Sequence, residues 1–132
     1  MENPKIEKNR NPLNALISLV ESLRGEGGCP WDQKQTPSTM LVYLLEEIYE
    51  LADAIESEQV GAVKEELGDV LFHIVFITHL FQEKGDFSID DVARDITVKM
   101  IRRHPHVFGA VDVQNIEEIR QNWQKIKLTE KK

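Results

Sequence analysis

The chain has 132 residues, of which 41% are hydrophobic and 30% charged, and its formal net charge is −7. This length and composition predict one globular domain spanning residues 1–132, with room for one hydrophobic core but not for two. The acidity argues against a nucleic acid partner, because such a partner requires a basic face that displaces counterions from the phosphates.

The first part of the sequence predicts a helix followed by a loop. Residues 1–11 are polar and are expected to form a loose lead-in. The first helix ends at Gly25, and its apolar positions at helical spacing are Leu13, Leu16, Ile17, Val20 and Leu23. The stretch from Gly25 to Pro37 is predicted to be a loop. Its Trp31 either caps the end of the hydrophobic core, which the residues alone slightly favour, or forms a wall of a ligand pocket.

The next two helices carry the most informative pattern in the chain. Thr36 and Pro37 supply a cap and a first-turn proline for a helix that runs to about Glu56, and the following helix extends to about Lys84. The short break between them, centred near Glu58, makes the two helices antiparallel neighbours. Five carboxylates of interest fall on these helices: Glu46, Glu47, Glu50, Glu66 and Asp69.

Helical geometry separates the acids from the apolar residues on the first of these two helices. The apolar face is formed by Leu41, Leu44, Leu45, Ile48, Leu51, Ala52 and Ile55, and the acids fall in an opposing arc. The second helix is apolar on nearly every side beyond Asp69, so we expect Glu66 and Asp69 to be partly buried.

The acids of the two helices also match in height. Glu50 and Glu66 lie about eight residues from the turn and Glu47 and Asp69 about eleven, so the four should face one another in two layers. Such a cluster repels itself and requires protons, water or a cation. An all-carboxylate set suits a hard divalent ion, Mg²⁺ or Mn²⁺, which also accepts phosphate oxygens as ligands. For any single acid, a solvated helix face is the simpler interpretation.

The C-terminal part predicts two further helices. The fourth helix ends near Arg103, because Pro105 disfavours helical backbone at His104. Residues 107–115 form a linker, and a short final helix precedes a frayed end over residues 128–132. The predicted fold class is therefore all-α, an antiparallel bundle of about five helices.

Lys99, Arg102 and Arg103 form the densest basic patch in this acidic chain. Cations at the end of a helix commonly do no more than stabilise the helix dipole. Lys99 and Arg103 lie one turn apart on one face, whereas Arg102 is about 100° round the helix and is expected to matter less.

The sequence gives no sign of export or membrane insertion. Its single cysteine cannot form an internal disulfide, and its first residues lack the apolar core of a signal peptide. The longest apolar run, from Val70 to Phe81, is too short to cross a bilayer. We therefore expect a cytoplasmic protein with no membrane partner.

Three motifs resemble those of the MazG-like nucleoside triphosphate pyrophosphohydrolases, an all-α family. The first is E-E-x-x-E from Glu46 to Glu50, followed after fifteen residues by E-x-x-D from Glu66 to Asp69. The second is G-C-P-W-D-Q-K-Q-T at residues 28–36, and the third is K-M-I-R-R-H-P-H-V-F-G at residues 99–109. Together they cover most of the chain.

The resemblance implies Mg²⁺-dependent hydrolysis of nucleoside triphosphates to the monophosphate and pyrophosphate, with Mn²⁺ as a substitute ion, in housekeeping of the nucleotide pool. The implied metal ligands are Glu47, Glu50, Glu66 and Asp69, and Glu46 is assigned to positioning or deprotonating the attacking water. The implied phosphate-binding residues are Lys99, Arg103 and Lys127. The implied nucleoside contacts are Trp31, Asp32, Gln35 and Trp123, although packing in the core is the simpler role for Trp123.

The apolar perimeter of residues 70–81 and the resemblance together predict a homodimer or a dimer of dimers. The sequence also allows two alternatives to a pyrophosphohydrolase. One is a non-catalytic helical interaction module whose acids lie at the surface. The other is a carboxylate-bridged di-iron bundle, which requires an E-x-x-H pair, whereas this chain has Glu66-x-x-Asp69 with His73 at the wrong spacing.

Overall fold

The computed structural model describes residues 11–131, and over this range the chain forms seven α-helices and no β-strand. The helices are α2 (Pro12–Arg24), α3 (Pro30–Gln33), α4 (Pro37–Glu56), α5 (Val60–Glu83), α6 (Ile89–Arg103), α7 (Pro105–Phe108) and α8 (Ile116–Glu130). The all-α prediction is confirmed. The predicted lead-in lies outside the described residues except for Asn11, whose side chain caps α2.

Helices α3 and α7 differ from the sequence prediction. Each has four residues, too few for an apolar repeat to show. Helix α3 interrupts the stretch expected to be a loop, and α7 overlaps the start of the expected linker. Each begins with a proline, Pro30 or Pro105, whose fixed backbone angle favours the first turn of a helix.

Contacts divide the chain into two compact units, Met1–Ile89 and Asp90–Lys132. The first unit contains α2 to α5, and the second contains nearly all of α6 together with α7 and α8. Among the described helices, none combines the length and the apolar composition needed to span a membrane.

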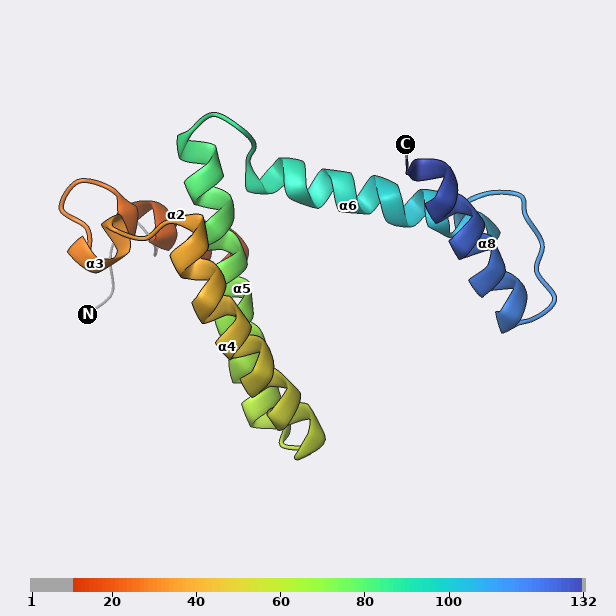
Figure 1. Ribbon diagram of the computed structural model, residues 1–132, viewed down its shortest axis with the longest axis horizontal. Coiled ribbons are helices and arrows are strands. Elements are labelled where there is room, and N and C mark those ends of the chain that lie inside the picture. The colour runs from red at the N-terminus through yellow and green to blue at the C-terminus, as the bar shows by residue number, and fades with distance from the viewer. Residues whose placement is uncertain (1–10, 132) are drawn as a thin grey trace. The chain divides into compact units, whose positions relative to one another are not determined.

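An antiparallel hairpin of α4 and α5 dominates the first unit (Figure 1). Thr36 caps α4 as predicted: its hydroxyl accepts a hydrogen bond from the Thr39 amide at 3.2 Å, and the Thr39 hydroxyl accepts one from the Thr36 amide at 2.9 Å. The turn between the helices includes Glu58, which has a φ of 55°. Both helices end within about one residue of the predicted positions.

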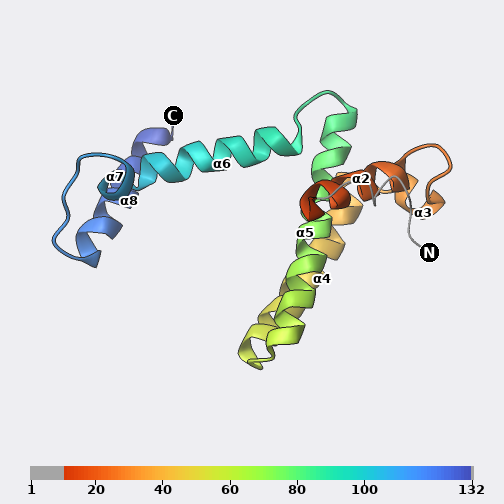
Figure 2. The same ribbon diagram turned by 180° about the vertical axis from the view of Figure 1, so that it is seen from behind.

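The hydrophobic core lies at the end of the hairpin away from this turn, where α2 packs against α5 (Figure 2). Its buried members are Val20, Met40, Val75, Phe76 and Leu80. Phe76 is completely buried, and its ring centroid lies 5.8 Å from that of Phe72. This core holds one end of the hairpin together, while the acidic residues lie nearer its middle.

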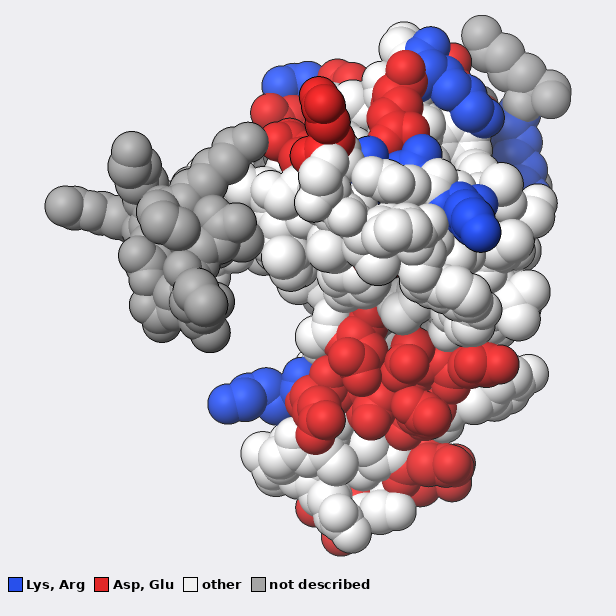
Figure 3. All heavy atoms as spheres, turned by 90° about the vertical axis from the view of Figure 1, so that its left-hand side faces the viewer, with Lys and Arg blue, Asp and Glu red and all other residues white. Residues whose placement is uncertain are grey.

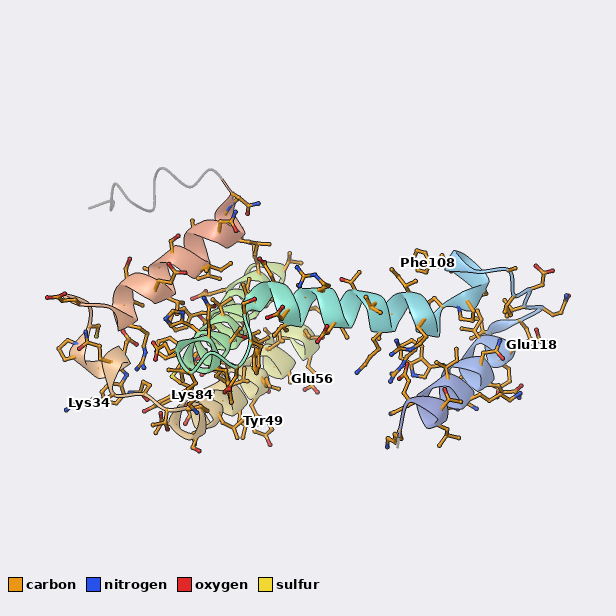
Figure 4. All side chains as sticks on the ribbon, turned by 90° about the horizontal axis from the view of Figure 1, so that it is seen from above. Lys34, Tyr49, Glu56, Lys84, Phe108 and Glu118 are labelled. Carbon is orange, nitrogen blue, oxygen red and sulfur yellow. The ribbon has the colours of Figure 1, made fainter. Side chains whose placement is uncertain are left out.

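Most of the apolar face predicted for α4 is not covered by the described residues of its own unit. Leu41, Leu45 and Ile48 are 49%, 47% and 43% exposed, and Tyr49, labelled in Figure 4, is 71% exposed. Most of the predicted apolar residues are thus exposed rather than part of the core of this unit. Helix α4 has one long neighbour in its own unit, α5, and the side of α4 that faces α5 includes an acid, Glu47.

In the second unit, ion pairs connect the end of α6 to the end of α8. None of the described residues of α6, α7 and α8 is fully buried. Arg102 and Arg103 both bind the carboxylate of Glu130. Helix α8 consequently runs on to Glu130, through most of the stretch where a frayed end was expected.

Candidate functional site

Three carboxylates from the two arms of the hairpin converge near its middle. Glu47 of α4 and Glu66 and Asp69 of α5 each offer one oxygen atom, and these atoms lie within 4.8 Å of one another. All three residues are half-buried. Figure 3 shows Asp and Glu side chains gathered in one patch over the hairpin. We refer to Glu47, Glu66 and Asp69 as the carboxylate cluster.

The pattern along each helix explains why Glu47 and Glu66 are half-buried. On α4, residues that are buried or half-buried recur at alternating spacings of four and three: Met40, Leu44, Glu47, Leu51 and Ala54. On α5 the corresponding series, at spacings of three and four, is Val63, Glu66, Val70, His73, Ile77 and Leu80. This is the spacing of the contact line between two packed helices. Glu47 and Glu66 therefore occupy positions that would ordinarily hold apolar side chains.

The two predicted layers of acids are not separate in the structure. Glu47, which was expected to face Asp69, lies within reach of both Asp69 and Glu66. Glu50 is exposed but remains close enough to raise the pKa of both Glu47 and Glu66. Glu46 is exposed and lies outside the three converging carboxylates.

Crowding and burial shift the protonation of the cluster. Burial is the largest cause raising the pKa of Glu47 to about 7, and contacts with Glu50 and Glu66 and the charge of Asp69 add to it. The pKa of Glu66 is also raised, chiefly by burial, with the charges of Glu50 and Asp69 contributing. Without a cation, the buried carboxylates therefore hold a proton more tightly than ordinary glutamates do.

Two enclosed carboxylate oxygens of the cluster have no hydrogen-bond donor among the described residues. Oε2 of Glu47 and Oε2 of Glu66 are enclosed and accept no hydrogen bond from the described residues. A buried polar atom without a partner costs free energy unless something else binds it. Because every converging donor is a carboxylate oxygen, the set fits a hard divalent cation such as Mg²⁺ or Mn²⁺ better than a thiophilic metal.

His73 does not join these carboxylates in a di-metal arrangement. Its Nδ1 lies 2.7 Å from the carbonyl oxygen of Asp69 and donates a hydrogen bond to it. Among the described residues, one group has ligand atoms close enough together for a metal site. It contains only Glu47, Glu66 and Asp69. The E-x-x-H pair of a di-iron bundle is absent from it.

The loop residues predicted to contact a nucleoside lie on and after α3. Trp31 is 61% exposed, and its ring centroid lies 6.4 Å from that of Tyr43, a half-buried residue that packs against the core. Asp32 is half-buried. Gln35 is buried, and its side-chain amide donates to the carbonyl oxygen of Trp31 at 2.9 Å. The three residues are thus brought together, with Trp31 at the surface and Gln35 inside the loop.

The three predicted phosphate-binding residues, Lys99, Arg103 and Lys127, line one pocket of about 420 Å³ in the second unit. The sequence prediction missed three further residues of this pocket, which are Arg102, Glu130 and Lys131. Arg102 was expected to point elsewhere, but its long side chain reaches Glu130 and so the same pocket. Nothing in the sequence indicates that pairing, because the two residues lie on different helices.

Glu130 holds the two arginines of this pocket. The Arg103 Nη2 donates to Glu130 Oε1 at 2.6 Å, and the Arg102 Nε donates to Glu130 Oε2. These bonds, that of Arg103 first, lower the pKa of Glu130 to about 2. The pocket therefore already binds one anion, a carboxylate of the chain itself.

Trp123 lies beside the same arginine. The Arg103 guanidinium carbon stands 5.1 Å from the centroid of the Trp123 ring, and the His104 ring meets that ring edge-on at 5.3 Å. Trp123 is half-buried. Both interpretations of this residue, packing inside the unit and contact with a nucleoside, therefore stay open.

Comparison with known protein families shows which family has this sequence pattern. Residues 35–108 match the MazG nucleotide pyrophosphohydrolase domain. The matched segment is more than half of the chain and contains the whole carboxylate cluster together with Lys99 and Arg103. The chain belongs to the MazG family.

The chain covers only part of the length of the curated relatives that it matches. It is 46% identical over 116 residues to the nucleoside triphosphate pyrophosphohydrolase/pyrophosphatase MazG of Thermotoga maritima, covering 88% of this chain and 44% of that protein. It is 42% identical over 122 residues to the nucleoside triphosphate pyrophosphohydrolase of Escherichia coli strain K12, covering 92% and 46%. It is also 46% identical over 119 residues to a Bacillus subtilis protein, YabN, covering 90% and 24%. The chain thus spans between about a quarter and a half of the length of these relatives.

A solved structure supports the same assignment. The crystal structure of a MazG-related protein from Thermotoga maritima matches with a TM-score of 0.72 and 27% identity, covering 87% of this chain and 98% of that one. The all-α fold is therefore that of the MazG family.

Proposed function

We propose that this chain hydrolyses nucleoside triphosphates to nucleoside monophosphates and pyrophosphate, and that it requires a divalent cation, Mg²⁺ in the first place. The observation that carries the proposal is the convergence of Glu47, Glu66 and Asp69 within 4.8 Å on two helices of a MazG-family chain. The printed names of the Thermotoga maritima and Escherichia coli relatives support the same reaction class.

The proposed metal ligands are Glu47, Glu66 and Asp69, with Glu50 completing the set from the exposed side. A bound Mg²⁺ would withdraw charge from the phosphates and lower the pKa of a coordinated water. Glu47 and Glu66 would then lose the protons that their burial favours, because a cation stabilises the ionised form. Glu46, one position before Glu47 and exposed, is proposed to orient the attacking water or accept its proton.

The proposed phosphate-binding residues are Lys99, Arg103 and Lys127, which share one pocket. Cleavage between the α- and β-phosphates leaves most of the developing negative charge on the departing pyrophosphate. Cations at that position stabilise the transition state as well as the bound substrate. Arg102 and Arg103 of this pocket bind the Glu130 carboxylate, which supports the proposal, and a phosphate would have to compete with that carboxylate.

The proposed nucleoside contacts are Trp31, Asp32 and Trp123. An exposed indole offers a face on which a base can stack, and a carboxylate can accept hydrogen bonds from base or sugar. Gln35 is assigned to the interior of the loop instead, because its amide nitrogen already binds the Trp31 carbonyl.

We further propose that the protein is cytoplasmic, serves the nucleotide pool, and assembles as a homodimer or a dimer of dimers. Apolar side chains left exposed on both arms of the hairpin support the assembly: Leu41, Leu45 and Ile48 on α4, and Leu67, Leu71 and Ile74 on α5. Contiguous apolar surface of this kind is uncommon on a monomer.

A panel of nucleoside triphosphates tests the proposal, with pyrophosphate and orthophosphate measured separately. We expect pyrophosphate with one or more nucleotides in the presence of Mg²⁺, and none after chelation of the metal. Release of orthophosphate as the first product, or no turnover of any nucleotide, would contradict the proposed reaction. The absence of turnover would favour the alternative of a helical interaction module.

A further inference from the structure

Arg24, the last residue of α2, has an unusual number of partners for a residue outside the carboxylate cluster. Its side chain is only 13% exposed. The Nη1 atom donates to the carbonyl oxygens of Asp32 and Gln33, each at 2.8 Å, and to that of Gln35 at 3.4 Å. One guanidinium nitrogen thus donates hydrogen bonds to three main-chain carbonyls, two in α3 and one just after it.

The other edge of the same guanidinium binds α5. Nε donates to Glu83 Oε2 at 2.9 Å, and Nη2 donates to Glu83 Oε1 at 2.6 Å, which is a two-point pairing of a planar cation with a carboxylate. Glu83 Oε2 also lies 3.2 Å from Nε2 of His79 on the same helix. Arg24 therefore ties the loop around α3 to the end of α5 next to the hydrophobic core.

The hydrogen bonds from Arg24 give the carbonyls of α3 partners that so short a helix cannot provide itself. The last carbonyls of a helix have no partner within it, and a four-residue helix has little stability of its own. Two side-chain amides add to these hydrogen bonds, since Gln33 Nε2 donates to the Gly25 carbonyl at 2.7 Å and Gln35 Nε2 to the Trp31 carbonyl. The chain also enters the loop by a close approach at Gly28, where a Cβ atom would lie 2.4 Å from the Leu23 carbonyl oxygen.

The main chain held in this way carries two of the proposed nucleoside contacts. Trp31 and Asp32 lie on α3 itself, and Arg24 binds the carbonyl of Asp32. Fixing that carbonyl fixes the direction in which both side chains leave the backbone. Arg24 is buried beneath the loop and does not need to touch a substrate to have this effect.

We propose that Arg24, through Glu83 and the three loop carbonyls, is a positioning residue that holds Trp31 and Asp32 in place for the nucleoside, and so sets nucleotide affinity and base discrimination. This inference rests on the proposed function. An arginine is required, because a lysine ammonium cannot present two donors to Glu83 and a third to the loop in one plane.

The test compares Arg24→Gln, Arg24→Lys and Glu83→Gln with wild type on the preferred nucleotide and on a poor one, at a temperature where all are folded. We expect KM for the preferred nucleotide to rise about tenfold or more, with kcat within about threefold, because the contacts become misplaced while the cluster is intact. The ratio of kcat/KM between the two nucleotides should fall toward one. Arg24→Lys should show the same rise in KM and the same loss of nucleotide preference as Arg24→Gln, although it keeps the positive charge. The matched control is Arg94→Gln, which removes an exposed arginine paired with Asp91.

Hydrogen exchange gives a second readout that does not depend on activity. Amides of residues 29–36 should exchange faster in Arg24→Gln and Glu83→Gln, whereas those in the middle of α4 and α5 should not. Glu83→Gln preserves side-chain shape and serves if Arg24→Gln fails to fold. If the variants lose thermal stability but keep the KM and the nucleotide preference of wild type, Arg24 has only a structural role. That result would overturn this inference and leave the proposed function standing. No turnover by wild type on any nucleotide would overturn the proposed function, and the inference with it.

Discussion

Glu47 of α4 and Asp69 of α5 lie on opposite arms of one hairpin, yet their carboxylate oxygens come within 4.8 Å of each other. Like charges at that distance repel, and Glu66 adds a third carboxylate within the same limit. Protons or a bound cation can relieve this repulsion, and a divalent cation at this position is what we propose.

The first prediction concerns the members of the carboxylate cluster. Asp69→Asn and Glu66→Gln should each lower kcat/KM by about a hundredfold or more, because a metal ligand is lost. The helical circular dichroism spectrum should be unchanged. Glu65→Gln, which alters an exposed acid next to Glu66 on the same helix, is the matched control and should retain full activity.

Thermal unfolding of the same variants separates metal binding from folding. In metal-free buffer, Asp69→Asn should melt at the same temperature as wild type or higher, because it relieves repulsion within the cluster. Addition of Mg²⁺ at about ten times its dissociation constant should stabilise wild type by about 1.4 kcal/mol and leave Asp69→Asn unchanged. Near-full activity in Asp69→Asn would remove the basis for the metal assignment.

The second prediction concerns the arginines that bind Glu130. Arg103→Ala should raise KM and lower kcat, with a combined loss of about 2–4 kcal/mol, the magnitude seen when one charge-stabilising donor is removed. Arg102→Ala should have a smaller effect, because its side chain is more exposed, at 47% against 11% for Arg103. If Arg103→Ala leaves kcat/KM within about threefold of wild type, the basic pocket is not the phosphate site.

The third prediction concerns the pH dependence of stability near Arg24. The hydrogen bond from Arg24, followed by other interactions with Arg24 and His79, lowers the pKa of Glu83 below its ordinary value of 4.5. An acid whose pKa is lower in the folded state stabilises the protein above the unfolded value and loses that contribution as pH falls through the folded value. The melting temperature of Glu83→Gln should therefore lie below that of wild type at pH 7, and the gap should narrow below about pH 4.5. A gap that stays constant between pH 7 and pH 3 would show that the charge of Glu83 is not involved.

The fourth prediction concerns assembly through the exposed apolar face of the hairpin. Wild type should scatter light as a species of at least twice the 15.2 kDa chain mass at micromolar concentration. Ile48→Glu places a charge among the exposed side chains of α4 and should shift the protein toward the monomer. Val60→Glu, at a more exposed apolar position at the start of α5, is the control and should leave the mass unchanged. A compact wild-type monomer would contradict the proposed homodimer.

Local sequence signals were sufficient to predict the long helices and, except for α8, where they end. Thr36 with Pro37, and Pro105 after Arg103, act on the backbone within a few positions, so their effect is visible in sequence. The convergence of Glu47, Glu66 and Asp69 was also predictable, because a short turn near Glu58 fixes the register of the hairpin.

Other features depend on partners that are remote in sequence or on elements too short to show a pattern. Arg24 and Glu83 lie 59 positions apart, and Arg103 and Glu130 lie 27 apart, with no local pattern to connect them. The apolar residues of α4 were correctly placed on one face, but periodicity cannot tell whether a face is covered by the same chain or remains exposed. The carbonyls of α3 are bound by Arg24, which lies outside the helix, so α3 could not be predicted from its own four residues.

In the proposed reaction, a metal ion held by the carboxylate cluster activates a water that attacks the α-phosphorus. The most direct test is hydrolysis in water enriched in oxygen-18, followed by mass spectrometry of the products. We expect equimolar nucleoside monophosphate and pyrophosphate, with one labelled oxygen in the monophosphate and none in the pyrophosphate. The same reaction should stop when Mg²⁺ is removed and when Asp69 is changed to Asn. Label found in pyrophosphate or orthophosphate, or equal product from Asp69→Asn, would contradict the proposed mechanism.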